Sequence, residues 1–126
     1  NRRLRVSRCR SLDQSLLATG FPYREEHLID PYLKSFSSFL HRADAVRRGG
    51  SAALDLAYVA QGRFDGFWES GLSEWDTAAG CLLVREAGGF VSDFRGRSEA
   101  IHADQVLAAN DALHSKLHKL LAGALR

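Results

Sequence analysis

The sequence has no methionine, only two prolines and two cysteines, and little excess of either charge. Because it begins Asn-Arg-Arg and holds no initiator methionine, we expect it to be part of a longer chain. No stretch approaches the roughly 18 apolar residues of a membrane span, and nothing resembles a signal peptide, so we expect a cytoplasmic protein without a membrane partner. Cys9 and Cys81 lack metal-ligand spacing, and we expect neither a disulfide nor a zinc site.

The charge balance is +2, from 17 basic and 15 acidic residues, which is too small to indicate a nucleic-acid surface by itself. The exception is the first ten residues, NRRLRVSRCR, which hold five arginines. Two interpretations remain open for this run. It is either an exposed arginine-rich strand or a contact surface for an anionic partner.

The 126 residues, 45% hydrophobic and 25% charged, suit one globular domain with its own core. Apolar runs and turn residues predict strands at 3–7, 15–21, 44–50, 64–70, 90–94 and 106–110. Amphipathic or apolar segments predict helices at 31–43, 52–61, 75–87 and 111–125, with Asp30 and Ser51 as the N-caps of the first two. The alternation predicts a mixed α/β fold in a single unit.

The helix predicted at 75–87 is apolar nearly all round, which is typical of a helix buried between layers. Glu69, Glu74 and Asp76 surround its start. Asp76 has two interpretations: it caps the helix, alone or in a capping box with Ser73, worth about 0.5 to 2 kcal/mol, or it binds a ligand. Carboxylate oxygens gathered at one crevice would suit a hard cation such as Mg²⁺.

A second candidate is RRGGSAA, residues 47–53. Glycines before a helix capped by Ser51 allow backbone N–H groups to approach an anion or a sugar hydroxyl. A simple turn followed by an N-cap explains the same residues equally well. His114 and His118, four apart in the last predicted helix, suit an exposed helix better than a metal-binding pair.

The stretch WDTAAGCLLVREAGG resembles the C-terminal signature of the inositol monophosphatase family, W-D-x-A-A followed by an apolar run and E-A-G-G. The segments RRGGSAALDLAYVAQGRFDGFWESGLSEWD and LLATGFPYR resemble what precedes that signature, especially in bacterial inositol-1-monophosphatases. The resemblance implies a layered α/β sandwich of the sugar phosphatase type. It also implies a Mg²⁺-dependent phosphomonoesterase that hydrolyses inositol monophosphates, usually as a homodimer.

Position in the signature also implies roles for single residues. Asp76 matches the metal-coordinating aspartate, and Glu69 matches a glutamate that binds a substrate hydroxyl. The Gly-Thr/Ser-Ala segment near the substrate is matched by Gly50, Ser51 and Ala52. Glu74 has no counterpart and is expected to be a surface or capping residue.

The family's other signature, D-P-[IL]-D-G-T, and an upstream glutamate supply most metal ligands, and this sequence contains neither. Its Asp30-Pro31 continues with Tyr-Leu. We therefore expect residues 1–126 to be the C-terminal part of such an enzyme, inactive without the N-terminal metal-binding part. The alternatives are a regulatory role with RNA or transcription-complex contact, as is implied for some bacterial members, and a related sugar- or nucleotide-phosphate phosphatase.

Overall fold

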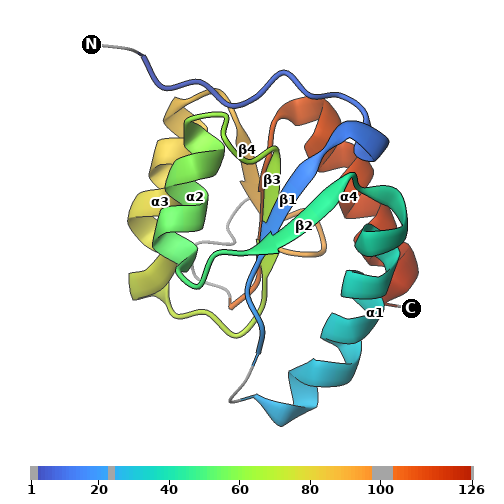
Figure 1. The fold of residues 1–126 in the computed structure, drawn as a ribbon. Coiled ribbons are helices and arrows are strands. Elements are labelled where there is room, and N and C mark those ends of the chain that lie inside the picture. Colours follow the sequence, from blue (N-terminus) through green and yellow to red (C-terminus); the bar gives the residue numbers. More distant parts are fainter. Residues whose placement is uncertain (1–2, 23–24, 98–103, 126) are drawn as a thin grey trace.

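The computed structural model describes residues 3–22, 25–97 and 104–125, and for Glu74 the backbone alone. Along the chain lie η1 (Leu12–Gln14), β1 (Leu16–Thr19), α1 (Glu26–Arg42), β2 (Ala45–Arg48), α2 (Ala52–Ala60), β3 (Gly66–Glu69), α3 (Glu74–Glu86), β4 (Phe90–Ser92), β5 (Val106–Ala109) and α4 (Asp111–Ala124) (Figure 1). No helix in these described ranges is long and apolar enough to cross a membrane.

The strands form one sheet in the order β2-β1-β3-β5-β4. β1 runs parallel to β2 and to β3, whereas β5 runs antiparallel to β3 and to β4. Helices α2 and α3 cover one face, and α1 and α4 cover the other (Figure 1). The predicted layered α/β architecture is therefore confirmed.

The first three strands bring their carboxyl ends to one edge of the sheet. They end at Thr19, Arg48 and Glu69, and α2 and α3 begin a few residues after β2 and β3. In open α/β sheets, this edge is where ligands bind, because loops and helix N-termini meet there.

The face covered by α1 and α4 has a closed aromatic core. Trp68 is 1% exposed, and its ring centroid lies 4.4 Å from that of Phe39 in an edge-to-face arrangement. The indole N–H of Trp68 donates to Ser35 Oγ at 3.0 Å, so the buried polar group has a partner. Leu113, Leu117 and Leu121 of α4 complete this core, as the spacing of the last predicted helix requires.

The opposite face is packed by α2 and α3 lying side by side (Figure 1). Gly80 permits their close approach, because a Cβ there would lie 2.6 Å from the Leu56 Cβ atom. Cys81 and Val84 of α3 are buried beside Leu56 and Val59 of α2. Cys81 is therefore a buried free cysteine.

The predicted strand at 3–7 is wrong. This segment crosses the molecule at the end of the sheet opposite the carboxyl edge, and it pairs with no strand among the described residues (Figure 1). Its backbone is held instead by helix ends: Val6 N–H donates to Ala87 O at 3.1 Å, and the Asn110 side-chain amide donates to Ser7 O at 2.9 Å and to Cys9 O at 2.7 Å. These contacts fix an extended segment without a sheet neighbour.

The predicted start of the first helix is also wrong. α1 begins at Glu26, so Pro31 lies inside the helix and Asp30 is not its N-cap. The apolar face continues upstream of Pro31 through Leu28 and Ile29, which are half-buried. Their burial explains why the helix extends beyond the proline that usually marks a first turn.

Helix α3 is not buried all round within this chain. Trp75 is 92% exposed and Leu82 is 56% exposed, and Ala78 and Ala79 are exposed as well. One side of α3 packs on α2 and the sheet, while the other side faces outward. The apolar composition of α3 predicted a helix between two layers. The described residues supply only one of these layers, and no described element covers the outer side of α3.

Candidate active site

The candidate site lies at the carboxyl edge of β1, β2 and β3, on the side of α2 and α3. Ala18 packs in the core beneath α2 and α3, so Gly20, two residues further along the extended chain, faces the same helices. The N-termini of α2 and α3 reach this edge with Ser51 and Ser73 as their N-caps. The sequence candidates Glu69, Asp76 and the glycine turn are thus brought to one end of the fold.

Asp76 is an exposed residue in the first turn of α3. Its Oδ2 atom accepts hydrogen bonds from Ser73 N–H at 3.3 Å and from Ser73 Oγ at 2.8 Å. The capping interpretation is therefore confirmed in its geometry. It does not exclude metal binding, because the carboxylate stays open to solvent at the mouth of the site. The Glu74 side chain, expected to be incidental, lies outside the described residues.

Glu69 is the last residue of β3, and its carboxylate lies against Gly20. A Cβ on Gly20 would meet Glu69 Oε1 at 2.0 Å, so no larger residue fits there without moving the carboxylate. Burial raises the pKa of Glu69 to about 7; the negative charges of Asp55 and Asp76 add to this rise, and Arg48 opposes it. A carboxyl group of this pKa exchanges its proton near neutral pH.

Asp55 is a residue of the site that sequence reasoning missed. It lies in α2, is only 2% exposed, and its Oδ2 atom has no hydrogen-bond partner among the described residues. Burial raises the pKa of Asp55 to about 6, although Arg48 lowers it in part. The available signal was one charged residue within the apolar helix AALDLAYVA, directly after a glycine turn.

The glycine turn has the geometry that the sequence predicted. Gly50 has a φ of +89°, which favours glycine, and Ser51 Oγ accepts the Leu54 N–H at 3.2 Å as an N-cap. Ala52 then begins α2. Gly50 is exposed, and Ser51 and Ala52 are half-buried, so a ligand can reach the turn.

The donor set does not amount to a complete magnesium site. Among residues 3–22, 25–97 and 104–125, no three His, Cys, Asp or Glu side chains are grouped so that they could hold a metal ion. Asp76 has an accessible carboxylate, whereas the Asp55 side chain is enclosed and the Glu69 carboxylate lies against Gly20. These residues fit one side of a cation site, and the remaining ligands would have to come from elsewhere.

The histidine pair lies away from this edge, on α4. The rings of His114 and His118 stack with their centroids 6.5 Å apart, and His114 Nε2 lies 2.7 Å from Ser92 Oγ. Since that nitrogen already has a hydrogen-bond partner, the structure favours the non-metal interpretation of the pair.

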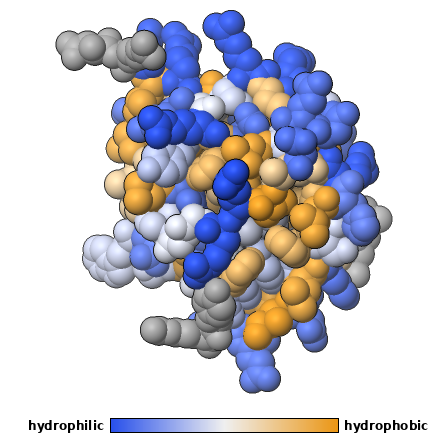
Figure 2. Space-filling view, viewed as in Figure 1, coloured by the Kyte–Doolittle hydropathy of each residue, from blue (hydrophilic) through white to orange (hydrophobic). Residues whose placement is uncertain are grey.

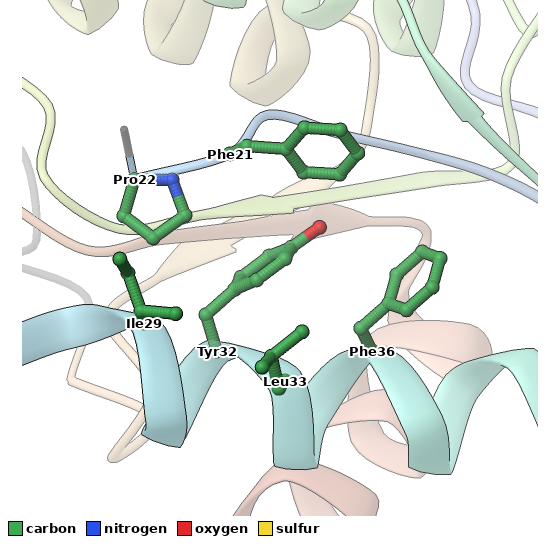
Figure 3. A pocket seen from close by; sticks show the side chains of 6 residues that line it. All are labelled: Phe21, Pro22, Ile29, Tyr32, Leu33 and Phe36. Carbon is green, nitrogen blue, oxygen red and sulfur yellow. The ribbon is translucent and has the colours of Figure 1, made fainter. Parts of the chain in front are cut away.

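An apolar pocket of about 320 Å³ lies on the other side of the sheet, between α1 and the segment after β1. Figure 3 shows Phe21 and Pro22 facing Ile29, Tyr32, Leu33 and Phe36 of α1 across it. The Tyr32 hydroxyl is already 3.0 Å from Thr19 Oγ1, and the lining residues that the structure describes include no carboxyl or basic group. Apolar side chains also gather on the surface over α1 (Figure 2). The described part of the lining is therefore apolar.

Comparison with known proteins agrees with this arrangement. The model of the inositol monophosphatase family matches residues 1–126. The chain belongs to the inositol monophosphatase family. A family relative named Nus factor SuhB, from Pseudomonas aeruginosa, is 55% identical over 111 residues, which are 86% of this chain and 41% of that protein. An inositol-1-monophosphatase from Synechocystis sp. is 46% identical over 123 residues, covering 97% of this chain and 43% of that protein.

A solved structure in the same family, the suhB protein of Bartonella henselae, superimposes with a TM-score of 0.90 at 45% identity. The match covers 96% of this chain and 47% of the Bartonella chain. The chain thus spans less than half the length of the inositol monophosphatase relatives that it matches.

Proposed function

We propose that this chain is the C-terminal part of a Mg²⁺-dependent phosphatase that hydrolyses inositol monophosphates or similar polyol phosphates. The observation that carries the proposal is the gathering of Glu69, Asp76 and the Gly50–Ser51 turn at the carboxyl edge of three parallel strands. Family membership supports the same reaction class.

The proposed roles follow the accessibility of each group. Asp76, exposed at the start of α3, is one ligand of the cation, with the other ligands on a part of the protein outside residues 1–126. Glu69 contacts a substrate hydroxyl from the end of β3. The turn formed by Gly50, Ser51 and Ala52 lies at the N-terminus of α2, where backbone N–H groups favour an anionic or hydroxyl oxygen.

Exposed apolar residues on the outer side of the α2–α3 layer are evidence that a further part of the protein packs there. Leu54 is 51% exposed on α2, and Trp75 and Leu82 are exposed on α3. Apolar residues grouped on one layer usually mark a surface that another element covers. We infer that the rest of the protein covers this layer and reaches Asp76 from the same side.

The test separates capping from metal binding at Asp76 by two matched variants of the full-length protein. Asp76→Asn keeps a side chain that caps well but removes the charge, whereas Ser73→Ala weakens the cap and keeps the charge. With inositol 1-phosphate as substrate, we expect Asp76→Asn to lower kcat at least about 100-fold and to raise the Mg²⁺ concentration for half-maximal rate. Ser73→Ala should leave both near the wild-type values.

The opposite pattern, with Ser73→Ala impaired and Asp76→Asn near wild type, would assign Asp76 to capping alone. The 126-residue chain by itself should show no measurable turnover of inositol 1-phosphate with Mg²⁺. Turnover by that chain would contradict the proposal that essential ligands lie outside it.

A second candidate function is contact with RNA in a transcription complex, and a different region of the molecule favours it. A hollow of about 380 Å³ at the opposite end of the sheet is lined by Arg3, Leu4, Arg5, Gln61 and Arg63. Three guanidinium groups around one hollow suit backbone phosphates. The relatives named Nus factor SuhB support this direction.

The RNA proposal is tested by the salt dependence of binding to a single-stranded RNA. Replacing Arg3, Arg5 and Arg63 by Gln should weaken binding and reduce the slope of log K against log salt by about 2, since each phosphate contact contributes roughly 0.7 on single strands. Asp76→Asn should leave this binding unchanged. An unaltered slope in the triple variant would refute the role of this hollow.

A further inference from the structure

Two glycines occupy neighbouring positions at the carboxyl edge of the sheet. Thr19 of β1 pairs with Arg48 of β2, and Gly20 and Gly49 directly follow this pair. A Cβ on Gly20 would lie 2.0 Å from Glu69 Oε1, and a Cβ on Gly49 would lie 2.0 Å from Asp55 Oδ1. Paired positions of adjacent strands face the same side of a sheet, so both carboxylates lie on one side, each over a glycine.

This arrangement brings two acidic groups into close range. Adjacent strands are about 4.8 Å apart, and carboxylates placed over neighbouring strand ends therefore repel one another strongly where water is partly excluded. Asp55 and Asp76 both act on Glu69 through their negative charge, and Arg48 is the cation that acts on both Asp55 and Glu69. The charged neighbours of Glu69 thus come from α2, α3 and β2.

The enclosed side chain of Asp55 lowers the stability of the folded protein. An enclosed carboxylate oxygen without a hydrogen-bond partner destabilises a folded protein, and Asp55 Oδ2 is such an atom among the described residues. The first turn of α2 does not need this side chain, because Ser51 Oγ already caps it. A buried carboxylate oxygen that no described group satisfies is a candidate for a role in the site.

We propose that Asp55 is a positioning residue that acts through Glu69: its enclosed charge confines the Glu69 carboxyl group to its place over Gly20 and, together with the burial of Glu69, keeps a proton on it. Glu69 then donates a hydrogen bond to a substrate oxygen, which an ionised carboxylate cannot do. A neutral Glu69 also avoids repulsion with the phosphate of the substrate. The inference rests on the proposed function in assigning Glu69 to substrate contact.

The first test measures the proton on Glu69 directly, without turnover. In the metal-free full-length protein with ¹³C-labelled glutamate, the Glu69 side-chain signal is assigned by its loss in Glu69→Gln and then titrated. We expect Asp55→Asn, which keeps the size of the side chain, to lower the titration midpoint of Glu69 by about one pH unit. The control Asp44→Asn removes an exposed carboxylate beyond the opposite end of β2 and should not move it.

The second test measures substrate binding and rate separately, with inositol 1-phosphate and Mg²⁺ from about pH 5.5 to about pH 8.5. KM should rise with pH where Glu69 loses its proton. Asp55→Asn should move this rise to lower pH by about one pH unit and change kcat at its optimum pH by less than about threefold. Gly20→Ala, which displaces Glu69 and leaves Asp55 in place, should raise KM across the whole range.

An unchanged Glu69 midpoint in Asp55→Asn would overturn the positioning role, as would a fall in kcat at every pH with no shift of the KM profile. A protein that titrates as expected but hydrolyses no phosphomonoester would refute the proposed function and leave the coupling of Asp55 to Glu69 established. The two failures are therefore distinguishable.

Discussion

The two faces of the sheet are built differently. On the face of α1 and α4, large aromatic side chains are enclosed and the indole N–H of Trp68 is satisfied by Ser35 Oγ. On the face of α2 and α3, Asp55 Oδ2 is enclosed with no hydrogen-bond partner in the described part of the chain, and Trp75 is almost fully exposed to solvent. Both faces have an apolar core, and Leu33 and Leu40 of α1 are also exposed, so the difference between the faces lies in the unsatisfied buried carboxylate.

This contrast separates stability from function within one small fold. Groups that cost stability persist where a site requires them, and the surrounding packing compensates for that cost. The α1–α4 face supplies the rigid support, and the carboxyl edge on the α2–α3 face holds the acidic groups near one another. Variants that exchange the properties of the two faces test this division.

The largest effect on the free energy of unfolding is expected at Trp68, compared with Trp75. Trp68→Ala removes an enclosed ring and its hydrogen bond, and we expect it to lower the free energy of unfolding by about 3 to 5 kcal/mol. Trp75→Ala removes a ring that is 92% exposed and should change it by less than about 0.5 kcal/mol. Urea unfolding of the 126-residue chain, followed by circular dichroism, measures both.

Trp68→Phe serves as a graded variant if Trp68→Ala does not fold, because it keeps an aromatic ring and loses the bond to Ser35. Equal losses for Trp68→Ala and Trp75→Ala would mean that α3 is stabilised by its outer side in the separate chain. In the full-length protein, Trp75→Ala should become destabilising if another part of the protein covers α3.

The sequence was most informative where local pattern and burial agree. The glycine turn capped by Ser51, the leucine spacing of α4 and the fully buried β5 all follow from the residues themselves. The segment 3–7 misled because its apolar and basic alternation resembles an edge strand, whereas its backbone bonds to Ala87 and Asn110. Such long-range partners leave no local signal.

The site was predictable in part for the same reason. Glu69 and Asp76 stood out through a family signature and through their place at a helix start. Asp55 did not, because its proposed role depends on its place against Gly49 and on the effect of its charge on Glu69, which lies 14 positions further along the chain. Proximity created by parallel strand pairing cannot be inferred from spacing in a single sequence.

A smaller effect concerns the pH dependence of stability that the carboxylate pair creates. In the folded chain, the pKa values of Asp55 and Glu69 are raised to about 6 and about 7 from 3.8 and 4.5. Below about pH 3 both groups are mostly protonated in the folded and the unfolded chain, and the folded state keeps this advantage in full. As the pH rises through about 7, the folded state must hold both charges, and the advantage is lost.

The free energy of unfolding that this pair contributes should therefore fall by roughly 2 kcal/mol between about pH 4 and about pH 7, after allowance for partial exposure of Glu69. Burial lowers the pKa of His114, which changes stability with pH in the opposite direction, so the wild-type curve alone mixes the two effects.

The measurement is the difference in the free energy of unfolding between wild type and the double variant Asp55→Asn/Glu69→Gln, from urea unfolding at each pH. Asp93 forms an ion pair with Arg97, and its pKa is lowered. The difference between wild type and Asp93→Asn should therefore have the opposite pH slope, because the stability that Asp93 contributes is lost on acidification. A difference curve that is flat for Asp55 and Glu69 would mean that the two faces of the sheet do not differ in this electrostatic cost.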